Sequence, residues 1–205
     1  MTARPIVAMA AAVAITTSAL VLGTRSSAVS EAGSAEAIPT PKDRVFLSDQ
    51  ESSRAAQTGL VPSNTRSVLN IRKRLRHGEF VWNDRGVPAG AITVRVELDK
   101  QLISVFRSGH EIGIAVVTFG ASGLDTPLGT FYVLAKMRQH RSSTYGAPMP
   151  YTLRLTNDGV SVHGSDVRWG TATHGCIGLP NEFARKLFDA VQVGQPVDIR
   201  SGSAV

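Results

Sequence analysis

The feature that most constrains this chain is an alternation of apolar and polar residues that begins at Ile92. From Ile92 to Asp99, every second residue is apolar and the residues between are polar. A period of two matches a β-strand, whose side chains point alternately to two faces. The pattern therefore predicts a strand with one buried face and one solvated face, which is typical of antiparallel sheets.

Further apolar runs, separated by turn residues, extend this strand into a sheet. Strands are expected over Leu102–Arg107, Ile112–Phe119, Phe131–Met137, Tyr151–Thr156, Val160–His163 and Val197–Arg200. The run Asn157-Asp158-Gly159 predicts a tight hairpin. A helix capped by Asn181 is expected before the last strand, because apolar residues recur there at helical spacing. The sequence therefore predicts a mostly β, mostly antiparallel domain over residues 81–201.

Three segments precede this domain. Arg4 is followed by an apolar run over 6–23 and then small residues, so residues 1–37 have the layout of a secretory signal peptide or a membrane anchor. Residues 38–62 are small and polar without apolar periodicity, which predicts a flexible spacer. Over 63–80, Val68, Ile71 and Leu75 share one helical face beside five cations, which predicts a basic helical segment.

The formal net charge of +6 indicates an anionic partner. Export through the predicted signal places the protein in the periplasm or cell wall, where nucleic acid is not an expected partner. Retention by an uncleaved membrane anchor is the alternative. Anionic wall polymer and the membrane surface are the partners that fit the basic segment. The simpler alternative is that its cations form a solvated helix face.

Cys176 is the single cysteine, which excludes an intrachain disulfide and a multi-cysteine metal site. Gly175 precedes it and Pro180 follows, so it is expected on a loop that runs into the helix near Asn181. A thiol ahead of a helix N-terminus has a lowered pKa, which favours a reactive thiolate. The alternative is a buried cysteine that acts as a small apolar side chain.

Two histidines are candidate partners for this thiol. His163 ends a predicted strand, and a loop over 165–173 can return Cys176 to it, while His174 lies two residues from the cysteine. The remaining histidines, His77, His110 and His140, are interpreted as surface residues. A zinc site of His163, His174 and Cys176 is an alternative, although no acidic general base lies nearby in the sequence.

The blocks Val162-His163-Gly164-Ser165 and Thr173-His174-Gly175-Cys176-Ile177 resemble the signature of the YkuD family of L,D-transpeptidases. Thr126–Phe131, Met149–Tyr151 and Gly194–Ile199 resemble further family motifs in the same order, so the resemblance covers roughly residues 90–200. It implies a β-sandwich-like fold, peptidoglycan stem peptides as donor and acceptor, and neither cofactor nor metal.

The resemblance also implies residue roles. Cys176 would attack the amide after the third residue of a stem tetrapeptide, form a thioester and pass the acyl group to a neighbouring stem as a 3–3 cross-link. His163 would be the base, oriented by the backbone of Gly164, and His174 would line the pocket. The backbone amides of Gly175 and Cys176 would hold the oxyanion. Met149, Tyr151 and Thr173 are the expected substrate contacts, together with an arginine discussed next.

This chain departs from the family pattern at two positions. Thr173 stands where the family usually has serine, and Gly178 stands where it usually has an arginine at the active site. We expect Arg168 to replace that arginine as the anchor of a substrate carboxylate, with Arg154 as the weaker candidate. The departures leave two alternatives open: an L,D-carboxypeptidase or amidase that uses the same thiol, and a non-catalytic wall-binding module.

Overall fold

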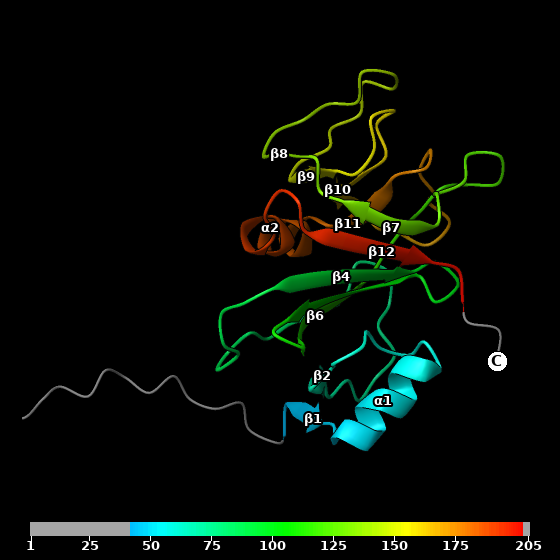
Figure 1. Ribbon diagram of the computed structural model, residues 1–205. Helices are drawn as coiled ribbons and strands as arrows, with labels where there is room; N and C mark the ends of the chain where they lie inside the picture. The colour runs from blue at the N-terminus through cyan, green and yellow to red at the C-terminus, as the bar shows by residue number, and fades with distance from the viewer. Residues whose placement is uncertain (1–41, 203–205) are drawn as a thin grey trace, which may run out of the picture. The chain divides into compact units, whose positions relative to one another are not determined.

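The computed structural model describes residues 42–202, which contain twelve strands and two helices (Figure 1). In chain order these are β1 (Arg44–Phe46), α1 (Asp49–Gln57), β2 (Ser67–Leu69), β3 (Phe80–Trp82), β4 (Ile92–Glu97), β5 (Leu102–Arg107), β6 (His110–Val116), β7 (Gly129–Tyr132), β8 (Ala135–Met137), β9 (Thr152–Arg154), β10 (Ser161–Ser165), β11 (Ile177–Pro180), α2 (Asn181–Ala190) and β12 (Pro196–Arg200). The predicted signal or anchor over 1–37 lies outside the described residues. Within residues 42–202, neither helix is long and apolar enough to cross a membrane.

The strands of residues 42–202 form two sheets. The larger sheet has eight strands in the order β1-β2-β6-β5-β4-β12-β7, with β3 also paired to β6. The smaller sheet has the order β11-β10-β9-β8. Most pairs are antiparallel, and the parallel pairs are β2–β6, β4–β12 and β10–β11. The mostly β, mostly antiparallel prediction is confirmed.

The alternating stretch forms β4, and its predicted partner forms β5 with the predicted bounds. The two strands pair antiparallel from Ile92 opposite Arg107 to Glu97 opposite Leu102. Val94 and Val96 are almost fully buried on one face. Arg95, on the face predicted to be solvated, is also buried, and it donates a hydrogen bond of 3.1 Å to the carbonyl of Gly59. The segment after α1 therefore covers this face at Arg95.

The flexible spacer predicted over 38–62 is wrong for its described part, which forms β1 and α1. Ser48 and Glu51 form a capping box, because the Ser48 side chain accepts from the Glu51 amide and the Glu51 carboxylate accepts from the Ser48 amide. The helix is mostly polar, and Ser52 is its one buried residue. Because the helix has no apolar stripe, hydrophobic periodicity does not predict it. The capping-box pattern of Ser48 and Glu51 is the signal in the sequence that indicates it.

The basic helix predicted over 63–80 is also wrong. Ser67–Leu69 form β2, Phe80–Trp82 form β3, and the residues between them form neither helix nor strand. Both strands pair with β6, so sheet hydrogen bonds replace the expected helical ones. The like charges of Arg72, Lys73 and Arg76 would have repelled one another at helical spacing.

The catalytic-domain boundary predicted at residue 81 is corrected by the burial of Arg44, which is 1% exposed. Its guanidinium donates hydrogen bonds of 2.6 Å to the carbonyls of both Glu111 and Asn83 and one of 3.1 Å to Ser67. The Glu111 carboxylate in turn accepts from the amide of Leu69 at 2.9 Å. These bonds join β1 and β2 to β6, so residues 42–80 belong to the same folded body as the predicted domain.

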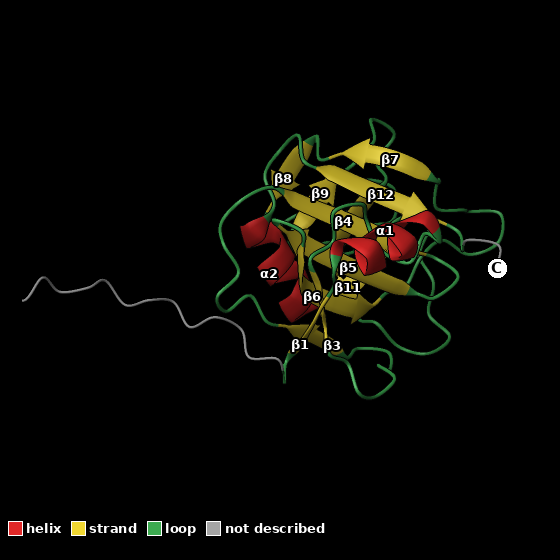
Figure 2. Ribbon diagram, turned by 60° about the horizontal axis from the view of Figure 1, so that its bottom comes forward, coloured by secondary structure: helices red, strands yellow, loops and turns green. Residues whose placement is uncertain are grey.

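The smaller sheet is covered by α2, which contacts β9, β10 and β11 (Figure 2). The helix begins at Asn181, but Pro180 occupies the N-cap position without a side-chain hydrogen bond, so the predicted Asn181 cap is wrong. Phe183 of α2 packs edge-on against Phe80 and Trp82 of β3, with ring centroids 5.7 and 5.4 Å apart. The strand predicted over Phe131–Met137 divides into β7 and β8, which belong to different sheets.

Candidate active site

His163 and Cys176 are brought together by the parallel pair β10–β11. The register sets Val162 beside Ile177 and His163 beside Gly178. Partners in a ladder point to the same face of a sheet, and alternate residues return to that face. Cys176 directly precedes β11, two residues before Gly178, the ladder partner of His163. The sequence blocks that contain the two residues meet at this point of the sheet.

The imidazole of His163 is 8% exposed, and its Nδ1 lies 2.9 Å from the carbonyl oxygen of Gly164. A carbonyl only accepts, so Nδ1 carries the hydrogen and Nε2 of the neutral ring keeps a free lone pair. Burial lowers the pKa of His163, against the opposing effect of the Gly164 carbonyl, and the nearby His140 lowers it further. His163 is therefore suited to accept a proton at Nε2.

The thiol of Cys176 lies against the backbone of β10. Its Sγ is 3.8 Å from the carbonyl oxygen of Gly159. Burial raises the pKa of Cys176, and a hydrogen bond with the Ser161 backbone opposes that rise. The prediction of a lowered thiol pKa at a helix N-terminus is wrong, because the four residues of β11 separate Cys176 from the start of α2.

The loop that carries Cys176 is held by backbone hydrogen bonds to the segment after β6. The amide of Thr173 donates to the carbonyl of Phe119 at 2.9 Å, and the amide of Ala121 donates to the carbonyl of Thr173 at 3.1 Å. The hydroxyl of Thr173 also donates to the carbonyl of Cys176. Thr173 thus carries a hydroxyl group, as the serine of the family pattern would. In this structure the hydroxyl bonds to the backbone carbonyl of Cys176 and so helps to position that residue.

Gly175 and Gly164 are required by local geometry. Gly175 has a φ of +101°, a conformation that side chains other than glycine rarely adopt. A Cβ at Gly164 would lie 2.4 Å from Oδ1 of Asn181 and 3.0 Å from Cγ of Pro150. The amide of Gly164 donates to the carbonyl of Pro150 at 2.7 Å. Residues 149–151 therefore run beside the strand that carries His163 and Gly164.

The predicted pocket residues lie in different surroundings. His174 is exposed and stacks on Tyr145, with ring centroids 4.0 Å apart. Met149 is buried, and Tyr151 packs edge-on against Phe188 of α2 at 6.0 Å. No contact between any of these side chains and Cys176 is recorded among residues 42–202, so their roles as substrate contacts stay predictions.

Gly178 lies in a space that excludes a side chain. A Cβ there would lie 2.5 Å from Oγ1 of Thr118 and 3.0 Å from Cβ of Ser165. The backbones of Gly178 and Thr118 also exchange hydrogen bonds of 2.8 and 3.0 Å. The position that holds arginine in the family pattern is thus filled here by Thr118 and Ser165.

The two candidate replacement arginines differ in their partners. Arg168 is largely exposed on the loop before Thr173 and pairs with Asp166 at 2.6 Å. Arg154 donates hydrogen bonds to the carbonyls of Thr156 and Asn157, so its guanidinium is held at the hairpin between β9 and β10. Arg168 remains the better candidate, because its exposed partner is a weak competitor for a substrate carboxylate.

The zinc alternative is not supported by the geometry. Among residues 42–202, no three His, Cys, Asp or Glu side chains are placed to hold a metal ion together. His174 stacks on Tyr145, and Nδ1 of His163 is occupied by the Gly164 carbonyl. The residues proposed as zinc ligands therefore do not form a shared coordination site in the described part of the chain.

Nothing in the sequence indicates that several further residues belong to this site. Gly159 and Ser161 contact the thiol through their backbones, so the identity of their side chains says little about that role. Thr118 lies 60 residues before Gly178 in the chain, and Tyr145 lies 29 residues before His174. Only the tertiary fold brings them beside these residues.

Comparison with known proteins agrees with this geometry. Residues 91–199 match the sequence profile of YkuD, described as an L,D-transpeptidase catalytic domain. L,D-transpeptidase 1 of Mycobacterium tuberculosis (strain ATCC 25618 / H37Rv) is 30% identical over 155 residues, which cover 67% of this chain and 59% of that protein. This chain thus spans about three-fifths of the length of that curated relative.

A second relative and a solved structure show the same similarity. The probable L,D-transpeptidase 3 of the same strain is 30% identical over 109 residues, which cover 44% of this chain and 40% of that protein. The crystal structure of an L,D-transpeptidase from Stackebrandtia nassauensis matches with a TM-score of 0.50 at 26% identity. That match covers 56% of this chain and 58% of that one.

Proposed function

Because this chain belongs to the YkuD family of L,D-transpeptidase catalytic domains, we propose that it is an exported enzyme that cross-links peptidoglycan stem peptides. The observation that supports the proposal is the β10–β11 register, which pairs His163 with Gly178, two residues after Cys176. Acyl transfer through a covalent intermediate requires a nucleophile such as a thiol, a base with a free nitrogen, and backbone amides that stabilise the oxyanion.

In the first half-reaction, Sγ of Cys176 attacks the carbonyl carbon of the third residue of a donor tetrapeptide. Nε2 of His163 takes the thiol proton, and the amides of Gly175 and Cys176 hold the tetrahedral oxyanion. When that intermediate collapses, the bond from carbon to nitrogen breaks. His163 passes the proton to the leaving amine, so D-alanine departs neutral at that nitrogen and a thioester remains on Cys176.

In the second half-reaction, an amine on the third residue of a neighbouring stem attacks the thioester carbonyl. His163 accepts a proton from this amine and returns it to the sulfur as the carbon–sulfur bond breaks. The product is a 3–3 cross-link, and the free thiol is regenerated. If water attacks instead of the amine, the same steps give an L,D-carboxypeptidase, which releases a shortened monomer.

The surroundings of the pair support proton transfer that accompanies attack. Burial raises the pKa of Cys176 and lowers the pKa of His163, so the thiol and the imidazole are both neutral near pH 7. The thiol therefore depends on His163 at the moment of reaction, rather than waiting as a preformed thiolate. Met149, Tyr151, Thr173, His174 and Arg168 are proposed to line the substrate-binding region around this pair.

The proposed location follows from the residues before the described body. The apolar run over 6–23 is proposed to direct export to the periplasm or cell wall, where peptidoglycan is found. The experiment that tests the function is product analysis after incubation of the full chain with purified tetrapeptide muropeptides. We expect a cross-linked dimer that disappears in Cys176→Ser. A shortened monomer alone would indicate the carboxypeptidase, and no product would indicate a non-catalytic wall-binding module.

A further inference from the structure

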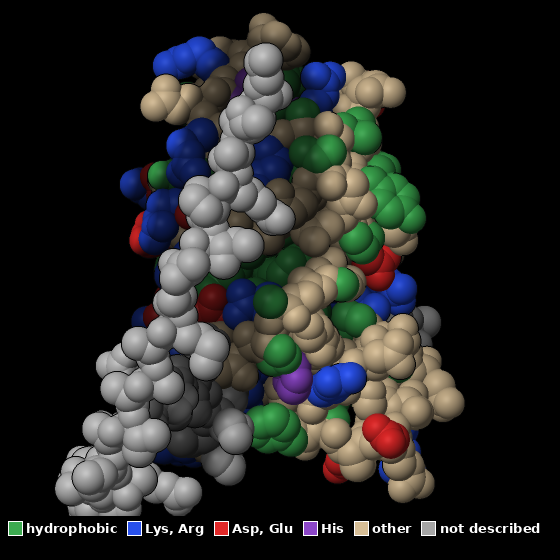
Figure 3. All heavy atoms as spheres, turned by 60° about the vertical axis from the view of Figure 1, so that its left-hand side comes forward, with side chains coloured by type: hydrophobic (Ala, Val, Ile, Leu, Met, Phe, Trp, Pro, Cys, Tyr) green, Lys and Arg blue, Asp and Glu red, His purple; other side chains and the backbone are tan. Residues whose placement is uncertain are grey.

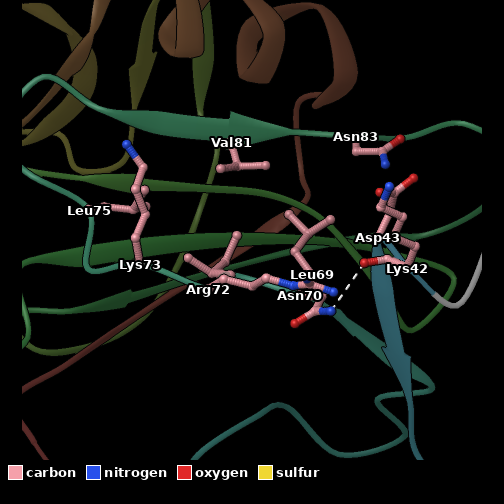
Figure 4. Close-up of a pocket in the computed structure, with 10 residues that line it drawn as sticks. Lys42, Asp43, Leu69, Asn70, Arg72, Lys73, Leu75, Val81 and Asn83 are labelled. Atoms are coloured by element: carbon pink, nitrogen blue, oxygen red, sulfur yellow. Dashed lines mark hydrogen bonds between the residues drawn. The ribbon is translucent and has the colours of Figure 1, made fainter.

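A second hollow in the molecule lies at the edge of the larger sheet, and none of its lining residues belongs to the site described above. Its volume is about 400 Å³, within the range of about 300–1,000 Å³ that is typical of small-molecule sites. It is lined by Lys42, Asp43, Leu69, Asn70, Ile71, Arg72, Lys73, Leu75, Val81 and Asn83 (Figure 4).

The hollow follows from the way in which β2 and β3 share one neighbour. Ser67 of β2 pairs with His110 at the start of β6, and Phe80–Trp82 of β3 pair with residues 113–115 further along β6. The chain leaves the sheet at Leu69 and rejoins it at Phe80, so the residues between pass outside the sheet edge. The space between that loop and the two strands remains open.

The hollow combines an apolar surface with positive charge. Leu69 and Val81 point toward each other from β2 and β3, and Ile71 and Leu75 add further apolar surface (Figure 4). Lys42, Arg72 and Lys73 contribute the cations. Asp43 is the acidic residue among the lining residues; burial lowers the pKa of the neighbouring Arg44, and the negative charge of Asp43 partly opposes that effect.

Two of the cations are available to a ligand. Lys73 is committed to Glu79, with Nζ 3.1 Å from the carboxylate. Lys42 and Arg72 are exposed, and neither makes an ion pair within residues 42–202. The surroundings are also basic, because Arg74 and Arg76 continue the same loop. On the face shown in Figure 3, Lys and Arg side chains are more prominent than Asp and Glu side chains, in line with the net charge of +6.

We infer that this hollow binds the phosphate head group of an anionic membrane lipid. Lys42 and Arg72 would contact the phosphodiester, and the apolar side chains of Leu69, Leu75 and Val81 would contact the glycerol and the first carbons of the acyl chains. The position in the chain fits this ligand if the apolar run over 6–23 stays in the membrane, because only residues 24–41 separate that run from Lys42. A wall-polymer phosphodiester would use the cations but not the apolar surface.

The test measures partition of the full chain into vesicles of phosphatidylcholine alone and of phosphatidylcholine mixed with an equal amount of phosphatidylglycerol. Binding to neutral vesicles reports the part of the affinity that does not depend on anionic lipid. For the double variant Lys42→Gln, Arg72→Gln we expect the additional partition into anionic vesicles to fall roughly 10- to 30-fold, since each cation at such a surface contributes about fivefold.

Two control variants separate the hollow from general electrostatics. Arg54→Gln, Arg85→Gln removes two exposed charges outside the lining residues, and we expect a loss of less than about threefold. Leu75→Ser keeps every charge and is expected to weaken anionic binding, because it removes apolar contact. All three variants should retain the wild-type product pattern with soluble muropeptides, because none of these residues belongs to the proposed catalytic machinery.

Three outcomes would overturn the inference. Equal losses in the two charge variants would show that net charge alone attracts the protein to the membrane. An unchanged Leu75→Ser would show that the apolar surface is not used. Competition by soluble glycerophosphoglycerol that is as strong as competition by short-chain phosphatidylglycerol would indicate a wall-polymer phosphodiester. Failure of the proposed enzymatic function would appear separately, as a missing product in the wild type.

Discussion

Burial acts on both Cys176 and His163, the proposed nucleophile and the proposed base. Burial raises the pKa of the thiol and lowers the pKa of the imidazole, so both groups are neutral near pH 7. The sequence placed the thiol ahead of a helix and predicted a thiolate instead. Because its pKa is lowered, His163 is protonated less than a free histidine at any given pH, which favours the neutral form that can accept a proton.

The first prediction concerns the pH dependence of thiol alkylation by iodoacetamide. Because burial raises the pKa of Cys176, the rate should continue to rise above pH 8.5, the approximate pKa of a free cysteine. Intact-protein mass spectrometry measures the rate, and every added group reports Cys176, the single cysteine. In denaturant the inflection should return to about 8.5. A rate that is already maximal near about pH 6 would instead show a thiolate at rest.

The second prediction concerns Gly178. A Cβ at this position would lie 2.5 Å from Oγ1 of Thr118, so Gly178→Ala should lower the free energy of unfolding by about 1–3 kcal/mol. Urea denaturation measures the change. Adding Thr118→Ala removes the obstructing hydroxyl and should recover part of the loss, because residues in contact are coupled. An unchanged free energy of unfolding in Gly178→Ala would contradict the steric account. Gly178→Arg could then be used to test whether an arginine at this position binds the substrate carboxylate.

The third prediction concerns Arg168 as the anchor of a substrate carboxylate. Its exposed pair with Asp166 is worth at most about 1 kcal/mol, less than the ~1.5–3 kcal/mol of a hydrogen bond to a charged group. Arg168→Ala should therefore lower kcat/KM for the donor tetrapeptide roughly 10- to 100-fold. Alkylation of Cys176 by neutral iodoacetamide should not change. A loss of less than about threefold would show that Arg168 is only a solvated loop residue.

At the scale of elements, periodicity identified strands that have one buried face and missed those that are short or buried on both sides. Leu102–Arg107 was predicted with its observed bounds, because β5 has six residues in a regular antiparallel pair. β2 has only three residues, too few to show a period. β11, Ile177–Pro180, contains a glycine and ends in a proline, both of which argue against a strand in the sequence. Its pairing with β10 is nevertheless what places the cysteine.

The fourth prediction tests whether β1 is part of the catalytic body. Arg44→Ala removes a buried guanidinium that donates hydrogen bonds to the Ser67 hydroxyl and to the carbonyls of Glu111 and Asn83, and it leaves these acceptors without that donor. Because a buried acceptor left unpaired costs about 1–3 kcal/mol, the free energy of unfolding should fall by about 2–5 kcal/mol. The matched control Arg54→Ala, on the exposed side of α1, should change it by less than about 0.5 kcal/mol. Equal effects of the two substitutions would mean that residues 42–69 do not contribute to the stability of the domain.

For the whole molecule, the signature blocks predicted the family correctly, whereas the local patterns predicted only part of the fold. His163, Gly164, Gly175 and Cys176 are conspicuous in the sequence because the chemistry needs those residue types in short blocks. The larger sheet could not be predicted in full, since its order brings residues 44–69 beside β6 and joins β12 to β4 across about a hundred residues. Such pairings are decided by packing between distant segments rather than by local periodicity.

The central claim is that Cys176 forms a thioester with the donor stem. The measurement that tests it most directly is intact-protein mass spectrometry of the full chain mixed with a tetrapeptide muropeptide and no acceptor. We expect one adduct whose mass equals that of the donor minus D-alanine, located on Cys176 after digestion. It should be absent in Cys176→Ser and strongly reduced in His163→Ala. An adduct that persists in Cys176→Ser, or cross-linked product formed by that variant, would contradict the account.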